Sequence, residues 1–242
     1  MENPGNFERL LTYGKKIHFS NANLLSTYIL VVLMVFFYNS PQQKTDVQIF
    51  FGFSQFFFAE RLSQQHGELE DLVTIVVDTT VCPIERPGSQ YGELQRFYYS
   101  GKHHYHCVKY EVALCRKTNR VVWVSPQVRG AMHDVTVFRT MGLKDNLLPQ
   151  ELALADKGYV GDENVMAPIK GRNLQQVDLI WNSIVSRNRI VIENFFSRVK
   201  WFQFTQIPWR HAIEDHELAF HTLVNILNVD LYFRPIQGPI EI

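Results

Sequence analysis

The sequence has little cysteine and no apolar stretch of the length that a membrane span needs. Its three cysteines, Cys82, Cys107 and Cys115, form no CxxC pair, and so sparse and odd a count indicates a reducing intracellular compartment. We interpret them as packing residues. The apolar run Tyr28 to Tyr38 has 11 residues, whereas a spanning helix needs roughly 20, so we expect a buried helix and no membrane role. Residues 1 to 23 are polar and mixed, and we expect neither a signal peptide nor a transit peptide.

The sequence also lacks an excess of either charge, internal repeats and low-complexity stretches. Lys plus Arg and Asp plus Glu both count 24, whereas a protein that binds the phosphate backbone usually carries a basic excess. The zero net charge therefore counts against nucleic acid as a partner, although the placement of charge matters more than its sum. With 46% hydrophobic and 13% aromatic residues, the 242-residue chain has enough apolar material for one sizeable core and a small accessory domain.

Residues 1–66 have few strand signals and are predicted to form a small helical region. A helix is expected over residues 23–38, where Pro41 would end it. Residues 45–51 and 55–64, separated by a tight turn with a glycine, have the outline of a helix-turn-helix. Any helical hairpin shares this outline, and the apolar second segment suits packing as well as DNA reading, so both interpretations stay open.

Residues 67–242 are predicted to form an α/β domain. Three strands in succession, then a helix, a fourth strand and later helices indicate an α/β layer architecture. Apolar runs, the first of them largely β-branched, predict the strands, at 72–78, 105–115, 120–125 and 151–156. Apolar residues at helical spacing predict the helices, at 133–143, 189–202 and 214–231.

Three carboxylates of this domain are candidates for a catalytic metal site. Asp78 and Asp156 each follow a buried strand. If those strands are neighbours, they lie about 4.8 Å apart, which suits the separation of roughly 3.5 to 4 Å between the cations of a two-metal centre. Glu193 would reach the same place from a helix. Oxygen-only ligands favour Mg²⁺ or Mn²⁺ over zinc. Considered singly, an Asp after a strand is often a turn residue, and a Glu on an amphipathic helix is usually a solvated surface group.

Asp134 competes with Asp156 as a metal ligand. It opens a predicted helix, where its carboxylate would accept hydrogen bonds from free backbone N–H groups and so needs no metal. No such local partner is evident for Asp156. We therefore favour Asp156 and keep Asp134 as the less favoured alternative.

Five segments, in order and with matching spacing, resemble the PIF/Harbinger group of DDE transposases and its domesticated nuclease relatives. The resemblance covers about residues 70–235, and its segments are VDTTVCPIERP (77–87), YYSGKHHYHCVKYEV (98–112), GAMHDVTVFR (130–139), LADKGYVG (154–161) and RNRIVIENFFSRVKWF (187–202). It implies a ribonuclease-H-like core, with a mixed central sheet flanked by helices, that cuts and joins DNA ends with Mg²⁺ or Mn²⁺. It places the three carboxylates at Asp78 in VDTT, at Asp156 in ADKGY, and at Glu193 in IEN. Thr79 departs from the glycine common at that position in the group.

Basic side chains near these segments are the predicted DNA contacts. They are Lys102, beside the histidines of KHHYH on an expected hairpin rim, and Arg189 and Lys200. The expected partner is DNA, and the expected location is the nucleus as well as the cytoplasm. A separate DNA-binding partner protein and a homo-oligomer stay open. So do two alternatives to an active nuclease, namely a domesticated DNA-binding protein that does not cut and an unrelated metal phosphoesterase.

Overall fold

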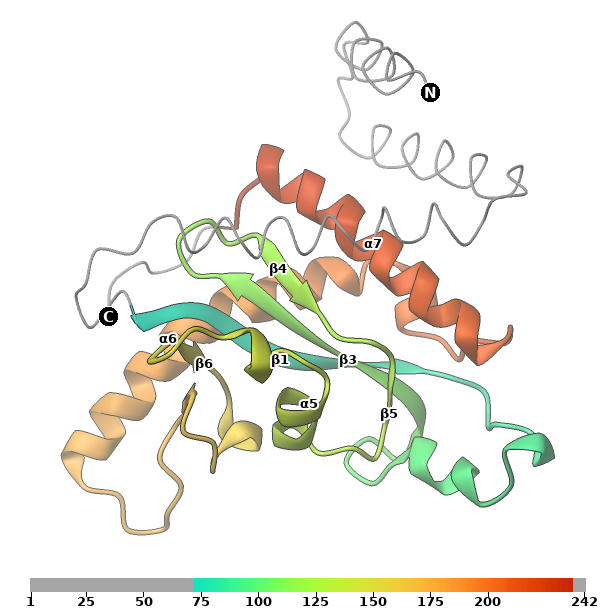
Figure 1. Cartoon of the computed structure of the whole chain (residues 1–242), viewed down its shortest axis with the longest axis horizontal. Helices are drawn as coiled ribbons and strands as arrows, with labels where there is room; N and C mark the ends of the chain where they lie inside the picture. Colours follow the sequence, from blue (N-terminus) through green and yellow to red (C-terminus); the bar gives the residue numbers. More distant parts are fainter. Residues whose placement is uncertain (1–71, 237–242) are drawn as a thin grey trace, which may run out of the picture. The chain divides into compact units, whose positions relative to one another are not determined.

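The computed structural model describes residues 72–236 of the chain (Figure 1). The predicted helix at residues 23–38 and the helix-turn-helix outline lie outside the described residues. So does the boundary placed after residue 66. Among residues 72–236, no helix is long and apolar enough to cross a membrane.

The described residues form seven strands, three α-helices and four short 3-10 segments. The strands are β1 (Val73–Pro83), β2 (Tyr99–Ser100), β3 (Tyr105–Cys115), β4 (Val121–Val124), β5 (Val128–Arg129), β6 (Leu152–Leu154) and β7 (Val165–Met166). The α-helices are α5 (Asp134–Thr140), α6 (Gln176–Val199) and α7 (Ile213–Phe233). The 3-10 segments are η2 (Ser89–Tyr98), η3 (Lys144–Asn146), η4 (Lys157–Tyr159) and η5 (Gln203–Thr205).

The strands form one mixed sheet with β1 and β3 at its centre. The order is β2-β3-β1-β6-β7, and β4 and β5 also pair with β3. β1 runs antiparallel to β3 and parallel to β6, and β6 runs parallel to β7. This arrangement fits the ribonuclease-H-like core that the resemblance implies, and the mixed α/β architecture is confirmed.

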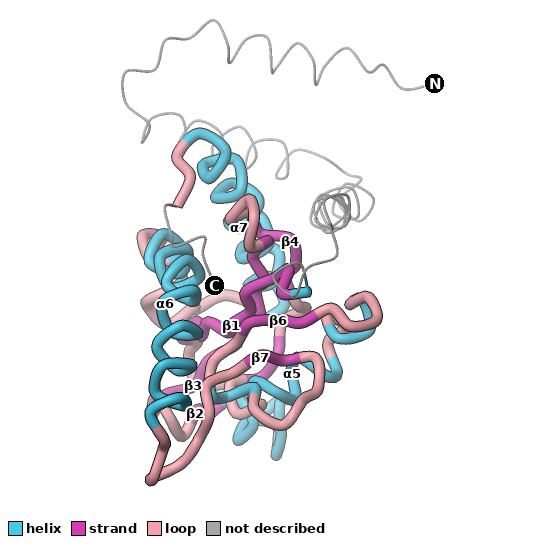
Figure 2. The backbone as a smooth tube through the Cα atoms, turned by 90° about the vertical axis from the view of Figure 1, so that its left-hand side faces the viewer, coloured by secondary structure: helices cyan, strands magenta, loops and turns pink. Residues whose placement is uncertain are grey.

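Helices cover both faces of the sheet. α6 and α7 pack on one face and α5 on the other, and Figure 2 shows α6 and α5 on opposite sides of β1 and β6. Successive residues of β1 therefore enter different cores: Val76 packs on the α6 side, whereas Ile75 and Val77 pack on the α5 side. Burial on both faces explains why the start of this strand is a continuous apolar run.

Two element boundaries differ by several residues from the prediction. β1 continues past Asp78 to Pro83, because the β-branched residues after Asp78 go on pairing with β3 as far as the pair Pro83 and Cys107. Asp78 is therefore inside the strand and does not end it. α6 begins at Gln176, well before residue 189, where Gln175 and Asp178 form a reciprocal capping box.

The first turns of α6 escaped prediction because their apolar residues face outward. Val177, Leu179 and Ile180 are 64%, 50% and 53% exposed, so they do not extend the periodic apolar stripe of the later turns. The other long elements agree closely with the prediction, since β3 spans residues 105–115 and α7 spans residues 213–233. The three cysteines are buried and free, which confirms their interpretation as packing residues.

Candidate active site at the end of the β1–β6 ladder

Asp78 and Asp156 lie at equivalent positions on two neighbouring parallel strands. The last pair of the β1–β6 ladder is Val76 with Leu154, and each aspartate follows its member of that pair by two residues. The two strands are neighbours, which is the condition on which the predicted site depends. The ends of parallel strands are the usual location of α/β active sites, so the topology brings both carboxylates to such a place.

Gly158 lies between Asp156 and Asp134. The Oδ1 atom of Asp156 accepts a hydrogen bond from the backbone N–H of Gly158 at 2.6 Å, which caps η4. A Cβ atom added at Gly158 would lie 2.6 Å from Oδ2 of Asp134 and 2.8 Å from Oδ1 of Asp156. Since real Cβ atoms do not approach oxygen so closely, the two carboxylates flank a position that only glycine fits.

The predicted role of Asp134 as a helix cap is wrong. Asp134 is the first residue inside α5, the cap position is His133, and no side chain makes a capping hydrogen bond there. Oδ1 of Asp134 instead accepts hydrogen bonds from the Thr79 hydroxyl at 2.7 Å and from the Lys109 ammonium at 2.8 Å. The carboxylate thus turns toward β1 and β3, because a buried ammonium is a stronger donor than a backbone amide. One of these two donors is Thr79, the residue that stands where the PIF/Harbinger group commonly has glycine.

Burial and neighbouring carboxylates shape the electrostatics of Asp78. Burial raises the pKa of Asp78 to about 6, and the charges of Asp156 and Asp134 raise it as well. Arg189 of α6 opposes them, because its Nη2 atom forms an ion pair with Oδ2 of Asp78 at 2.7 Å. The backbone N–H of Thr79 also donates to Oδ1 of Asp78 at 2.7 Å. The positive charge around Asp78 therefore does not fully offset the effects of burial and of the neighbouring carboxylates on its ionised form.

Glu193 lies one helical turn beyond Arg189 and is turned toward solvent. Its side chain is 57% exposed, and its Oε1 atom lies 3.8 Å from Nη1 of Arg189. Asp134 and Asp156, and not Glu193, are the carboxylates that raise the pKa of Asp78. Within residues 72–236, no three His, Cys, Asp or Glu side chains are arranged so that they could hold a metal ion. The guanidinium of Arg189 thus pairs with the carboxylates of both Asp78 and Glu193.

The donor atoms at this site nevertheless suit a hard divalent cation. All the candidate ligands are carboxylate oxygens, which Mg²⁺ prefers. The raised pKa of Asp78 shows that its ionised form needs more positive charge than Arg189 alone supplies. Asp78 and Asp156 would hold the cation, and Glu193 would join them if its side chain left solvent.

Three further polar residues at this site were missed by the sequence analysis. Lys109 and Glu111 lie on β3, and both are buried, Glu111 completely. The pKa of Glu111 is raised to about 8, chiefly by burial and also by the charges of Asp134 and Asp78, although the nearby hydroxyl of Tyr159 lowers it. Neither the carboxylate oxygens of Glu111 nor the Tyr159 hydroxyl has a hydrogen-bond partner within the described residues. The signal was the alternation of charged and apolar residues in VKYEV, since Lys and Glu are rarely buried without a role.

The predicted DNA-binding residues have different surroundings. Lys102 is exposed in the turn between β2 and β3. The Lys200 ammonium instead donates to the carbonyl oxygens of Val81 and Thr205, at 2.6 and 2.9 Å, and Arg189 is paired with Asp78. Arg189 and Lys200 are thus engaged within the protein, because each lies where α6 packs against β1. Their binding to DNA stays a prediction.

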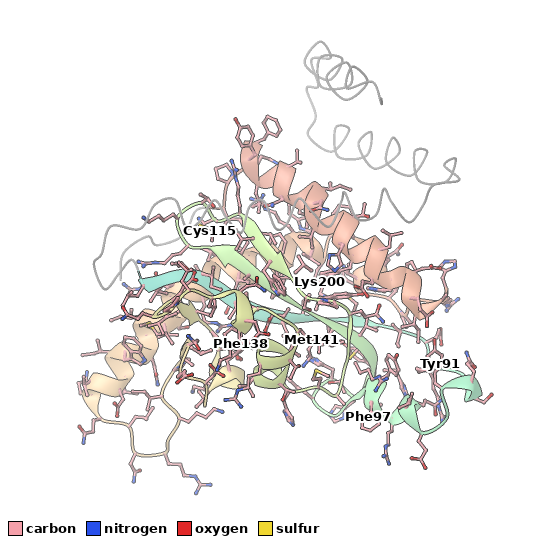
Figure 3. The ribbon with its side chains drawn as sticks, in the orientation of Figure 1. Tyr91, Phe97, Cys115, Phe138, Met141 and Lys200 are labelled. Atoms are coloured by element: carbon pink, nitrogen blue, oxygen red, sulfur yellow. The ribbon has the colours of Figure 1, made fainter. Side chains whose placement is uncertain are left out.

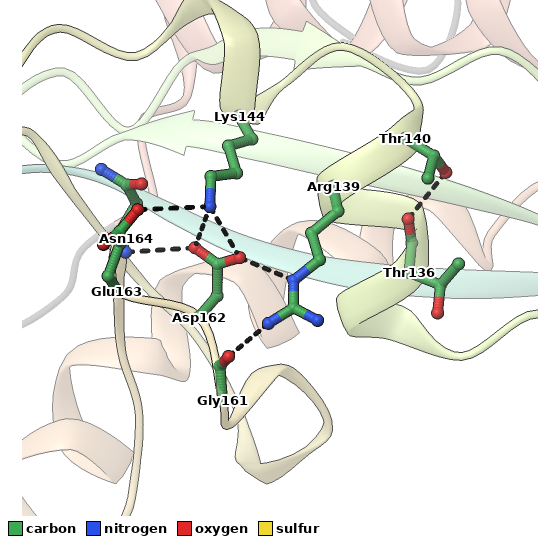
Figure 4. Close-up of polar contacts among 8 residues, drawn as sticks. All are labelled: Thr136, Arg139, Thr140, Lys144, Gly161, Asp162, Glu163 and Asn164. Atoms are coloured by element: carbon green, nitrogen blue, oxygen red, sulfur yellow. Dashed lines mark hydrogen bonds and ion pairs between the residues drawn. The ribbon is translucent and has the colours of Figure 1, made fainter.

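An ion cluster around the buried carboxylate of Asp162 fixes the segment that follows Asp156. The Asp162 side chain is 1% exposed and receives Nε of Arg139 at 2.7 Å and Nζ of Lys144 at 3.0 Å (Figure 4). Arg139 also donates to the carbonyl oxygen of Gly161. Burial raises the pKa of Asp162, but the hydrogen bonds from Arg139 and Lys144 outweigh it, so the pKa is lowered. The cluster ties α5 and η3 to the η4–β7 loop, and so holds the turn with Gly158 against Asp134.

Comparison with known proteins assigns the family. Residues 77–228, which carry all the candidate carboxylates, match the family described as DDE superfamily endonuclease. The chain belongs to this family. It is also similar to a protein of Microchaete diplosiphon named as a probable transposase for insertion sequence element IS702, with 29% identity over 167 residues. That match covers 66% of this chain and 58% of the relative, so the chain spans somewhat more than half of that relative's length. No solved structure matches the chain.

Proposed function

We propose that this DDE superfamily endonuclease cleaves phosphodiester bonds of DNA, as a metal-dependent nuclease of the transposase kind. The observation that carries the proposal is the placement of Asp78 and Asp156 side by side past the end of the β1–β6 ladder, where each carboxylate would help to hold the same cation. Family membership and the similarity to a probable transposase support it.

Each acidic residue has a role in this proposal. Asp78 and Asp156 hold the cation, and Glu193 is the third ligand. Mg²⁺ or Mn²⁺ bound there, as one or two ions, would activate a water for attack on phosphorus and stabilise the leaving 3′ oxygen. Asp134 contributes indirectly, because Lys109 and Thr79 hold its carboxylate beside Gly158. Arg189 would favour the ionised form of Asp78, and its guanidinium also pairs with Glu193.

The finer assignments rest on the resemblance to the PIF/Harbinger group of DDE transposases. We propose that the chain is of the PIF/Harbinger type, that its core is ribonuclease-H-like, and that strand joining accompanies cleavage. Lys102, exposed at the β2–β3 turn, is the proposed DNA contact that the fold leaves most accessible. Residues 1–66 are the proposed helical region, residues 67–242 the proposed catalytic domain, and the nucleus the proposed location.

A second candidate function is DNA binding without cleavage. The position of Arg189 favours it, since the guanidinium already neutralises Asp78 and holds Glu193 at the surface. A chain in which this pairing persists would keep the fold and lose the reaction.

Nicking of a supercoiled plasmid by the full chain tests the proposal. We expect nicking with Mg²⁺ or Mn²⁺ and none with EDTA. Asp78→Asn, Asp156→Asn and Glu193→Gln should each reduce the rate at least about 100-fold, the scale on which enzymes lose rate when one charge-stabilising group is removed.

Two exposed acidic residues provide matched controls. Asp145→Asn and Glu163→Gln make the same chemical changes outside the site, since Asp145 is exposed and the Glu163 side chain is 86% exposed. Both should nick at the wild-type rate. Undiminished nicking by the Asp78 or Asp156 variant would refute the catalytic assignment, and absence of metal-dependent nicking by the wild type would favour the second function.

A further inference from the structure

An exposed aromatic side chain lies against the segment that leads into Asp134, and it has no part in the proposed cleavage. Phe97, near the end of η2, is 39% exposed. The guanidinium of Arg96 lies over its ring at 5.0 Å from the centroid, and that of Arg129 on β5 lies at 5.8 Å. We call Arg96, Phe97 and Arg129 the aromatic shelf. Figure 3 shows Phe97 at the η2 end of the domain.

The segment around the shelf is basic in an otherwise neutral chain. Between Arg86 and His106 the sequence has a single carboxylate, Glu93, against the cations Arg86, Arg96 and Lys102. Glu93 lies 3.9 Å from Arg96, but both side chains are highly exposed, so their pairing is weak and solvent-screened. The local charge therefore suits a polyanion, which the net charge of the whole chain does not suggest.

Backbone hydrogen bonds connect the shelf to the acidic site. The N–H of Ala131 donates to the carbonyl oxygen of Phe97, and the N–H of Met132 donates to that of Arg129, both at 3.0 Å. The Lys109 ammonium then binds the carbonyl oxygen of Met132 at 2.7 Å and the carboxylate of Asp134 at 2.8 Å. Asp134 follows Ala131 by three positions, and such a stretch spans at most about 11 Å.

The packing around the shelf is close. A Cβ atom at Gly130 would collide with the side chain of Cys107 and with the carbonyl oxygen of Tyr98, so only glycine fits between Arg129 and Ala131. The shelf is thus held at a fixed place, a few residues from the carboxylates.

We propose that the aromatic shelf binds an unpaired base of the DNA substrate, which stacks on the Phe97 ring in place of the exposed Arg96 guanidinium, with the adjoining phosphates contacted by Arg96 and Arg129. The inference rests on the proposed function in that DNA is the substrate. Every base has an aromatic face, so an exposed ring binds unpaired bases with little sequence preference, and flanking guanidinium groups add stacking and phosphate contacts. Bases inside a duplex already stack on both sides and leave no face for Phe97.

A similar pair elsewhere in the chain provides a matched control. The Arg120 guanidinium lies 5.1 Å from the ring centroid of Tyr232, which is 65% exposed. Arg120 accepts a hydrogen bond from the backbone of Cys115, so this pair lies at the opposite end of β3 from the β2–β3 turn. Figure 3 shows Cys115 and Phe97 far apart in the domain.

The test measures binding of the full chain, in EDTA, to a short fluorescent single-stranded oligodeoxynucleotide and to its duplex. Phe97→Ala and Phe97→Leu should weaken single-strand binding about 5- to 100-fold, the effect of losing one stacking contact, and should leave duplex binding unchanged. Phe97→Trp should retain binding. Arg129→Gln should lower the salt dependence of single-strand binding by about 0.7 in the log–log slope, as expected for one lost phosphate contact.

The outcomes separate this inference from the proposed function. Full single-strand affinity in Phe97→Ala and Phe97→Leu would overturn the shelf, whether or not the wild type nicks plasmid. So would an equal loss of duplex binding, an equal loss in Tyr232→Ala, or no single-strand binding by the wild type. Because the measurement is made without divalent metal, failure of cleavage leaves its result intact. Unchanged melting temperatures of the variants would show that the losses of affinity come from lost contacts with the oligonucleotide and not from unfolding.

Discussion

Replacement of Glu111 by glutamine should remove the pH dependence that this buried carboxyl imposes on stability. The pKa of Glu111 is raised from 4.5 to about 8, first by burial and then by Asp134 and Asp78. Between pH 4.5 and 8 the folded protein holds a proton that the unfolded chain has released. Stability therefore falls as pH rises through this window, by about 1.4 kcal/mol per pH unit for one such group.

The magnitude follows from the width of the window. From pH 4.5 to pH 7 the loss amounts to roughly 3 kcal/mol, a large fraction of the stability of a typical domain. Glu111→Gln removes the titration and leaves a buried amide, whose unsatisfied groups impose a cost of about 1–3 kcal/mol that does not vary with pH. The variant should thus gain on the wild type steadily as pH rises.

Urea unfolding in EDTA, followed by tryptophan fluorescence across this pH range, measures the effect. Glu151→Gln is the matched control, because Glu151 is also buried but accepts hydrogen bonds from the Thr74 hydroxyl and from the backbone N–H of Leu148. That variant should lose about 1–3 kcal/mol, since an amide cannot replace a carboxylate that accepts several bonds. A constant difference between the wild type and Glu111→Gln from pH 5 to pH 8 would refute the reasoning.

The remaining predictions concern the carboxylate cluster. Gly158→Ala should reduce Mn²⁺ affinity and nicking at least about 10-fold, as changes beside metal ligands do, because the added Cβ displaces the carboxylates of Asp134 and Asp156. Gly101→Ala is the control and should be neutral, because a Cβ there meets nothing within 4 Å. Isothermal titration with Mn²⁺ checks both variants. Asp134→Asn should lower the free energy of unfolding by about 1–3 kcal/mol, because Lys109 loses its charged partner, and a normal urea midpoint would contradict this. Arg189→Gln should raise the pKa of Asp78 above about 6, because Arg189 lowers it. Since only the ionised carboxylate binds metal, the acid limb of the nicking profile should then move to higher pH, and an unmoved limb would exclude this role for Arg189.

The sequence alone determined the longer strands and helices among the described residues. β3 and the later turns of α6 were predictable because apolar residues recur in them at regular spacing along the sequence. That spacing depends only on the local geometry of a strand or helix. The adjacency of Asp78 and Asp156 was predictable to the extent that two buried strands, each followed by an aspartate, tend to pair in an α/β sheet. The motifs carried the family, which the comparison with known proteins confirmed without its PIF/Harbinger subdivision.

Only the tertiary structure decided what surrounds each carboxylate. The sequence places Asp134 at a helix start, which favours a cap, but the turn of its side chain toward Lys109 depends on β3, which local rules do not include. The pairing of Arg189 with Asp78 joins residues more than a hundred positions apart. The carboxylate of Glu111 lacks a hydrogen-bond partner among the described residues because α5 and Tyr159 exclude water from its face of the sheet. Sequence periodicity reports which face of an element is buried. The partner that each buried charge meets is decided by the packing of elements distant in the chain.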